Sequence, residues 1–280
     1  MPPTALIYKN LGETPLEALE RFRLEQIRIN AENLAKNSGQ NSLDGLVENL
    51  AEDAIKWKLV PMTYAGRLDP MAEGELLILI GDECKNKEKY LGLDKEYEVE
   101  ILFGVTTDTH DILGLVTNVP KGRPSQVPII NFSKYIGKFT QPYPAYSSKT
   151  VNGKQLHELA RAGELPEEMP KKNVEIYSIS EIENADHVKG WLRQITTQEL
   201  QTRIFKSIDL VKGDFRQIEI KAKWNEVLSG DQAKSQLFDV VTIRVKCSSG
   251  TYMRSLAHKI GQDRGCGAIA LSIKRTKIFL

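Results

Sequence analysis

Alternating and periodic apolar positions divide the chain into interleaved strands and helices. Apolar runs and period-two alternation predict strands at 5–8, 75–81, 95–103, 174–182, 217–221, 239–246 and 269–273. Apolar stripes at helical spacing and helix-start signals predict helices at 15–30, 43–57, 85–89, 132–139, 156–162, 197–211, 224–228 and 253–260. Asn152-Gly153 is a hairpin turn signal. This order predicts an α+β fold with a mixed, mainly antiparallel central sheet flanked by helices and loops.

The helix predicted at 253–260 carries a cation in an unfavourable place. Met253, Leu256, Ala257 and Ile260 form its core face at positions i, i+3, i+4 and i+7, and Arg254 lies off that stripe. A cation near a helix N-terminus is disfavoured by the helix dipole unless an anion pairs with it. We therefore expect a carboxylate opposite Arg254.

The stretch at 184–234 is polar and is interpreted as a lobe inserted into the fold. The length of 280 residues suits one large domain or two, and no internal repeat or low-complexity tract divides the chain. We therefore expect a single domain over residues 1–280 with an inserted lobe at 184–234.

Charge is balanced overall but not locally. The composition, 41% hydrophobic and 27% charged with a formal net charge of +1, is that of an ordinary globular protein. Residues 247–280 hold six Lys or Arg against one acid, and residues 134–161 hold five against one. Two such segments indicate either a basic groove for nucleic acid or two solvated faces, and composition does not choose between them.

Cysteine usage and the N-terminal residues indicate the compartment. Cys84, Cys247 and Cys266 lack the spacing of disulfide pairs or zinc ligands, which fits a reducing compartment. The first ten residues lack the layout of a signal peptide, and no apolar run reaches the roughly 18 residues of a membrane span. We expect a cytoplasmic protein with no membrane association.

A single carboxylate stands in a Gly/Pro-rich turn before the apolar run at 75–81. In Gly66-Arg67-Leu68-Asp69-Pro70, proline has no backbone donor and restricts Asp69 to extended conformations. Such a loop holds the Asp side chain outward, as a nucleophile requires. Asp is equally a favoured turn residue, so these residues alone leave a structural turn and a catalytic Asp open.

A second polar loop, Thr106 to Gly114, contains Asp108, His110 and Asp111. These residue types can bind a metal ion, and a metal-dependent hydrolase that also uses Asp69 is one hypothesis. Only one His is present and no partner cluster lies nearby in sequence. The alternative is a hydrogen-bonded loop that closes a hairpin, and we expect no metal and no cofactor.

Several separated strings resemble the TruB family of tRNA pseudouridine synthases and occur in the order of that family. They are YKNLGETPLEAL, GRLDPMAEGELLI, KEYEVEILFGVTTDTHDILG, SSKTVNGKQLHELARAG, CSSGTYMRSLAHKIGQDRGCGA and SIKRT. The resemblance covers most of residues 5–175 and 239–278. It implies the pseudouridine synthase fold and a single catalytic domain over 1–280. The chain ends soon after the basic strand, so the family's C-terminal RNA-binding PUA domain is expected to be absent, and the insert at 184–234 is a candidate for RNA contacts.

The resemblance also implies a reaction, the conversion of uridine to pseudouridine without cofactor or metal. Asp69 matches the family's nucleophile, and Arg254 matches the residue that pairs with it. Tyr97 matches the tyrosine that lies against the target base and assists proton transfer. Tyr252 and Ile273 match the aromatic and apolar walls of a pocket for a flipped-out base. From the sequence alone, Tyr97 and Tyr252 could equally be aromatic residues of the hydrophobic core.

The RNA contacts implied by the resemblance lie on basic segments. Lys149 and Arg161 fall in the string that resembles the family's RNA-clamping loop, and Lys274 and Arg275 fall in its basic strand end. Tyr64 stands where many members have a His that helps to open the RNA loop. The implied protein is a monomeric pseudouridine-55 synthase acting on the T-loop of the tRNA T-arm. A non-catalytic RNA-binding or tRNA-folding module and a guide-RNA-dependent relative remain alternatives.

Overall fold

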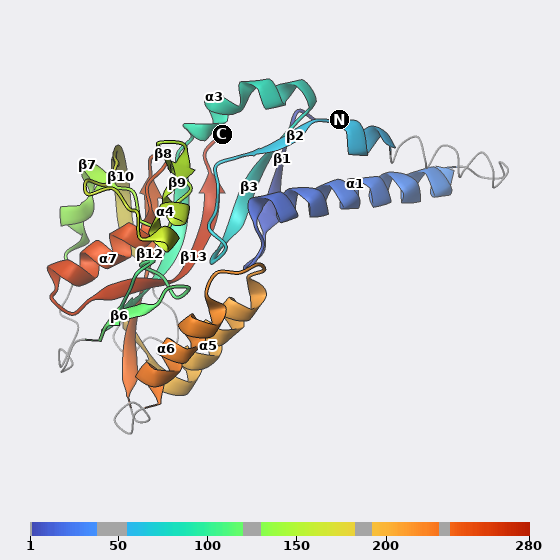
Figure 1. Cartoon of the computed structure of the whole chain (residues 1–280). Coiled ribbons are helices and arrows are strands. Elements are labelled where there is room, and N and C mark those ends of the chain that lie inside the picture. The colour runs from blue at the N-terminus through green and yellow to red at the C-terminus, as the bar shows by residue number, and fades with distance from the viewer. Residues whose placement is uncertain (1, 38–54, 120–129, 183–191, 230–235) are drawn as a thin grey trace.

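A nine-stranded sheet forms the centre of the computed structural model (Figure 1), which describes residues 2–37, 55–119, 130–182, 192–229 and 236–280. Its strands are β1 Thr4–Lys9, β2 Met62–Ala65, β3 Ala72–Ile80, β4 Lys95–Phe103, β7 Gly137–Pro142, β10 Lys171–Glu181, β11 Leu192–Thr196, β12 Leu237–Cys247 and β13 Ala268–Ile278. The order is β1-β3-β13-β4-β12-β10-β7, with β2 pairing β3 and β11 pairing β12. Within the described strands only β13 and β3 pair in parallel, so the predicted mixed, mainly antiparallel α+β fold is confirmed.

Two small hairpins stand beside the sheet. One pairs β5 Thr106–Thr107 with β6 Val116–Asn118, and the other pairs β8 Thr150–Val151 with β9 Lys154–Gln155. Asn152 and Gly153 form the turn of the second hairpin, with φ of 50° and 82°. Positive φ at both central residues is typical of a type I′ turn, which Asn-Gly predicts.

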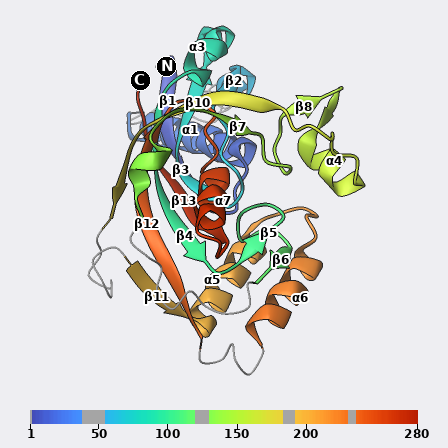
Figure 2. The same ribbon diagram turned by 90° about the vertical axis from the view of Figure 1, so that its left-hand side faces the viewer.

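Helices and short 3₁₀ segments surround the sheet. They are α1 Pro15–Asn37, α3 Lys87–Leu91, α4 Leu156–Ala162, α5 Thr197–Leu210, α6 Gln217–Leu228, α7 Met253–Asp263 and the 3₁₀ turns Gly81–Asn86 and Phe132–Tyr135. α7 lies against β13 and β4, whereas α1 projects away from the sheet (Figure 1). Figure 2 shows α4 and β8 above the level of α7, and α5 and α6 below it. Within the described part of the chain, no helix combines the length and the hydropathy that a membrane crossing requires.

The N-terminal helix begins as the sequence predicted and ends later. The Thr14 hydroxyl accepts from the Glu17 amide, and the Glu17 carboxylate accepts from the Thr14 amide, which forms a capping box. Ala18 and Leu19 pack against β3 in a small core of their own. The helix continues past the expected end at 30 to Asn37. Residues 43–54 of the helix predicted at 43–57 lie outside the described residues, and residues 55–59 are helical.

The strand predicted at 217–221 is wrong, because these residues begin α6. Ile218 and Ile220 suggested alternation, but Ile218 is 86% exposed while Ile220, Trp224 and Leu228 are buried on one helical face. The prediction at 132–139 is correct only for its first half. Phe132–Tyr135 is a 3₁₀ turn, and β7 starts at Gly137, whose φ is 111°.

Residues 192–229, the described part of the stretch interpreted as an inserted lobe, are continuous with the main core. β11 pairs with β12, and α5 and α6 pack on each other. Leu200, Ile204 and Trp224 are fully buried in the same hydrophobic cluster as Ile101 and Val241 of the sheet. This attachment places the loop between α5 and α6 beside the cleft described next.

Candidate active site

The loop between β2 and β3 places Asp69 between two buried apolar residues. Leu68 and Met71, on either side of the Asp69-Pro70 pair, are buried in the core. The Ala72 amide donates to the Asp69 carbonyl oxygen at 3.0 Å. The Asp69 carboxylate itself is 36% exposed. The loop therefore fixes its backbone in the core and leaves one carboxylate facing outward.

Arg275 on β13 holds this loop from behind. Its Nε donates to the carbonyl oxygen of Glu75 at 2.6 Å, and its Nη1 and Nη2 donate to those of Arg67 and Gly66 at 3.4 and 3.3 Å. The residue is 1% exposed. Arg275, predicted to contact RNA, is thus buried against the loop backbone, and it also belongs to the lining of the cleft described below. Lys274, the preceding residue, is exposed.

Arg254 joins three separate segments at the site. Its Nε lies 2.8 Å from Oδ2 of Asp69 and 3.4 Å from Oδ2 of Asp111. Its Nη1 donates to the Thr109 carbonyl oxygen at 2.9 Å, and its Nη2 to the Tyr146 carbonyl oxygen at 3.1 Å. The guanidinium is almost fully buried. The carboxylate expected opposite this helix-terminal cation is therefore present, and a second one lies beside it.

The contact of Asp111 with Arg254 was not predicted from the sequence. Its Oδ1 accepts from the Thr109 hydroxyl at 2.6 Å and from the Leu113 amide at 2.9 Å. Burial raises the pKa of Asp111 to about 6, and the Arg254 guanidinium opposes that rise. The Thr-Asp-Thr-x-Asp string contained this residue, but spacing alone does not show which carboxylate faces the arginine.

The other polar residues of this hairpin have partners of their own. Asp108 accepts from the Leu115 amide at 2.8 Å and from Nη1 of Arg216 at 2.8 Å. The His110 ring stacks on His258 with centroids 3.8 Å apart. Among the residues that the structure describes, no three His, Cys, Asp or Glu side chains are grouped to hold a metal ion. The loop is the connection of the β5–β6 hairpin.

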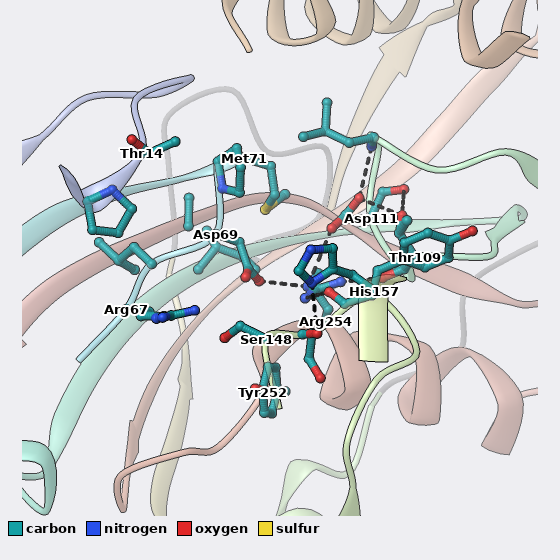
Figure 3. Close-up of a pocket in the computed structure, with 18 of the residues that line it drawn as sticks. Thr14, Arg67, Asp69, Met71, Thr109, Asp111, Ser148, His157, Tyr252 and Arg254 are labelled. Atoms are coloured by element: carbon teal, nitrogen blue, oxygen red, sulfur yellow. Dashed lines mark hydrogen bonds and ion pairs between the residues drawn. The ribbon is translucent and has the colours of Figure 1, made fainter. Parts of the chain in front are cut away.

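A cleft of about 770 Å³ opens in front of the Asp69 carboxylate. Tyr97 from β4, Tyr252 at the start of α7 and Ile273 from β13 line it together with Asp69 and Arg254. Figure 3 shows the Asp69 and Arg254 side chains pointing toward one another, with Tyr252 on one side of the pair. The cleft thus combines the Asp69–Arg254 ion pair with aromatic and apolar walls.

Tyr97 and Tyr252 are protonated at neutral pH. Burial raises the pKa of Tyr97. Burial also raises the pKa of Tyr252 to about 12, and the Asp69 charge adds to that rise. Each phenol can therefore donate a hydrogen bond to a group bound in the cleft.

The remaining predicted residues lie at or beyond the rim. Tyr64 and Arg161 line the cleft. The Nζ of Lys149 is 5.6 Å from the Tyr143 ring, and Lys149 is exposed outside the cleft lining, as is Lys274. A further part of the lining had no signal in the sequence; it comes from the loop between α5 and α6 and includes Val211, Lys212, Asp214, Phe215 and Arg216.

A family model and the curated relatives of this chain indicate the same protein family. The model of the TruB family pseudouridylate synthase N-terminal domain matches residues 56–204. A tRNA pseudouridine synthase B of Francisella tularensis subsp. holarctica is 30% identical over 219 residues, 76% of this chain and 54% of the relative. Those of Syntrophomonas wolfei and Thermosipho melanesiensis are each 31% identical, covering 79% and 88% of this chain and 59% and 62% of the relatives.

The chain therefore spans between about half and three fifths of the length of the curated relatives it matches. Among solved structures, a Cbf5-Nop10-Gar1 complex is similar at 16% identity and a TM-score of 0.47, over 98% of this chain and 48% of that chain. The match to residues 56–204 covers more than half of the sequence and includes Asp69 and Tyr97. The chain belongs to the TruB family of pseudouridylate synthases.

Proposed function

We propose that this chain isomerises uridine to pseudouridine in RNA, with the T-loop of tRNA as its substrate. The observation that carries the proposal is the Asp69–Arg254 ion pair, 2.8 Å long, in a cleft lined by Tyr97, Tyr252 and Ile273. Family membership supports the reaction, and the curated relatives are named tRNA pseudouridine synthase B.

The proposed chemistry begins with Asp69. An oxygen of its carboxylate bonds to C1′ of the ribose while the N1–C1′ bond breaks, and the bonding electrons leave with the uracil ring. The ring then turns, and C5 bonds to C1′ while the bond between C1′ and the Asp69 oxygen breaks, which regenerates the free carboxylate. C5 loses a proton and N1 gains one, so product and substrate have the same atoms and no oxidant or cofactor is consumed.

Tyr97 and Arg254 have distinct roles in this scheme. Arg254 fixes the direction of the Asp69 carboxylate, because its guanidinium is itself held by the carbonyl oxygens of Thr109 and Tyr146. Tyr97 is a protonated phenol in the cleft wall, suited to donate a hydrogen bond to the base and to relay its proton.

The walls of the cleft suit an unstacked base. Proteins that act on a base take it out of the stack and hold it against aromatic or apolar side chains. Tyr252 and Ile273 supply such surfaces beside Asp69. We propose that Tyr64 contacts the same RNA loop, because it also lines the cleft.

Cations around the cleft are the proposed contacts for RNA phosphates. Arg161 lines the cleft rim, and Lys149 and Lys274 are exposed. Phosphate contacts of this kind position RNA without reading its sequence. We also propose that the protein acts as a monomer in the cytoplasm, where the free thiols of Cys84, Cys247 and Cys266 suit a reducing environment.

An assay on unmodified tRNA tests the proposal. Wild-type protein should form pseudouridine at one T-loop position, and D69N should form none while its affinity for tRNA is unchanged. D82N is the matched control, because Asp82 is an exposed carboxylate that pairs with Lys85. Wild-type binding without product would identify a non-catalytic RNA-binding module. Product formed by D69N would remove Asp69 from the mechanism.

A further inference from the structure

The loop between α5 and α6 reaches from the insert into the active-site cleft. Arg216, the last residue before α6, has a φ of 72°. A non-glycine residue in this left-handed region is uncommon and persists where surrounding contacts hold it. The contacts of the Arg216 side chain supply such a restraint.

Arg216 touches two loops at once. Its Nη1 donates to Oδ2 of Asp108 at 2.8 Å, and its guanidinium carbon lies 4.7 Å from the centre of the Tyr146 ring. The side chains of Arg216 and Asp108 are each only 23% exposed. A charge-assisted hydrogen bond and a cation–π contact therefore act together in a partly desolvated place.

These two loops are the ones that hold Arg254. The residue after Asp108 is Thr109, whose carbonyl oxygen accepts from Nη1 of Arg254, and the Tyr146 carbonyl oxygen accepts from its Nη2. Arg216 thus restrains the side chains of Asp108 and Tyr146. The two carbonyl oxygens that accept from Arg254 belong to Tyr146 itself and to the residue after Asp108. Movement of either acceptor would change the direction in which Arg254 presents its Nε.

We infer that Arg216 is a positioning residue of the active site. It acts through Asp108 and Tyr146 on Arg254, and through Arg254 on the Asp69 carboxylate. The loop between α5 and α6 then helps to orient the catalytic residues and does not merely line the cleft. The inference rests on the proposed function for its kinetic test, and on the observed contacts alone for its spectroscopic test.

The kinetic test uses R216G, R216K and D108N. Glycine adopts a φ of 72° without strain, so R216G removes the side chain while keeping the backbone conformation. We expect kcat for pseudouridine formation to fall about 10- to 100-fold with an unchanged KM, since small misplacements of catalytic groups have effects of this size. R216K, which keeps the charge beside Asp108, should recover part of the loss.

The R216G/D108N double variant shows whether Arg216 acts through Asp108. If it does, the double variant should be hardly slower than R216G alone, because residues in one network are not additive. K221M is the matched control. Lys221 pairs with Asp209 across the same two helices and lies outside the cleft lining, so its loss should leave kcat unchanged.

A second readout does not need activity. In ¹⁵N-arginine-labelled protein, the Nε–H resonance of Arg254 is identified by its loss in R254K. R216G should shift this resonance and speed its exchange with solvent, whereas K221M should not. If wild-type protein has no activity, this measurement still decides the inference while the proposed function fails.

Three results would overturn the inference. R216G with wild-type kcat and an unchanged Arg254 resonance would show that Arg216 does not position Arg254. A rise in KM alone would make Arg216 an RNA contact. Equal losses of kcat in R216G and K221M would show a general effect of the helical pair.

Discussion

Nε of Arg254 lies 2.8 Å from Oδ2 of Asp69, although the two residues come from opposite halves of the chain. The arginine is almost fully buried while the carboxylate remains partly exposed. One side of the pair is therefore fixed in the core and the other faces the cleft. Asp111, 3.4 Å from the same Nε, shares the guanidinium charge.

Removing Arg254 should cost both stability and activity. R254A would leave the buried Asp111 carboxylate without its cation, and breaking a buried pair in this way costs about 3–5 kcal/mol. Urea denaturation of R254A should show a loss of this size, and pseudouridine formation should be abolished. R254M/D111N, with both charges removed, should regain most of the stability but not the activity. Wild-type stability in R254A would contradict the observed pair.

Replacing Tyr97 by Phe should remove proton transfer while keeping the wall of the cleft. General acid–base groups contribute about 10²- to 10⁴-fold to rate, so we expect Y97F to lower kcat within that range. Its melting temperature should stay near that of the wild type. Y135F is the control, since the Tyr135 hydroxyl donates to Asp263 away from the cleft lining. If Y97F and Y135F had equal kcat, Tyr97 would be only a packing residue.

The stacked His110–His258 pair should make stability sensitive to acid. Burial, with the nearby charges of His258 and Arg254, lowers the pKa of His110 from its ordinary 6.5 to about 3. Unfolded protein binds this proton more readily than folded protein. The stabilising effect is therefore complete above pH 6.5 and is lost as the pH falls toward 3.

H110N should reduce this acid sensitivity. Asn tolerates the φ of 62° at this position and does not titrate. Urea denaturation at several pH values between 7 and 4 should show a shallower decline for H110N than for the wild type. Identical slopes would mean that His110 is not protonated on unfolding in that range.

The proposed RNA contacts predict a change in salt dependence. K149Q/R161Q/K274Q should bind tRNA more weakly, and the slope of log affinity against log salt should fall by about one for each phosphate that the variant no longer binds. Because these side chains lie at or outside the rim, kcat at saturating tRNA should be unchanged. K85Q, which removes an exposed lysine paired with Asp82, is the control for loss of a single surface cation away from the cleft. A slope unaffected by the triple change would exclude these residues as phosphate ligands.

The sequence predicted β4 and α4 with their observed bounds but did not predict β2, β7 and β11. Strands with one buried face show a period of two that survives in the sequence, as β4 does. Ile218 and Ile220 show the same spacing by chance in a helix. The burial of Ile220 and Trp224, four residues apart, shows that this segment is helical, and the sequence spacing alone does not. The polar end of α1 carries no apolar stripe, so its continuation to Asn37 had no local signal.

Site residues could be predicted from the sequence where a short motif contains the reactive or charged side chain. The turn around Asp69 and the unfavourably placed cation of Arg254 were both visible in the sequence. The dipole argument predicted a carboxylate opposite Arg254, and the family resemblance identified it as Asp69. Arg275 was predicted only as an RNA contact, because its hydrogen bonds to the carbonyl oxygens of Glu75, Arg67 and Gly66 depend on how β13 lies beside β3. Arg216 was missed because its role exists only once the insert is folded against the hairpin of Asp108.

The hold of β13 on the Asp69 loop has a consequence for synthesis. Translation delivers Asp69 early, but Arg254 and the Arg275 side chain that binds the loop carbonyls emerge from the ribosome much later. A nascent chain still short of these residues has its carboxylate on an unbraced loop. The observed geometry of Asp69 therefore depends on residues as far along the chain as Arg275.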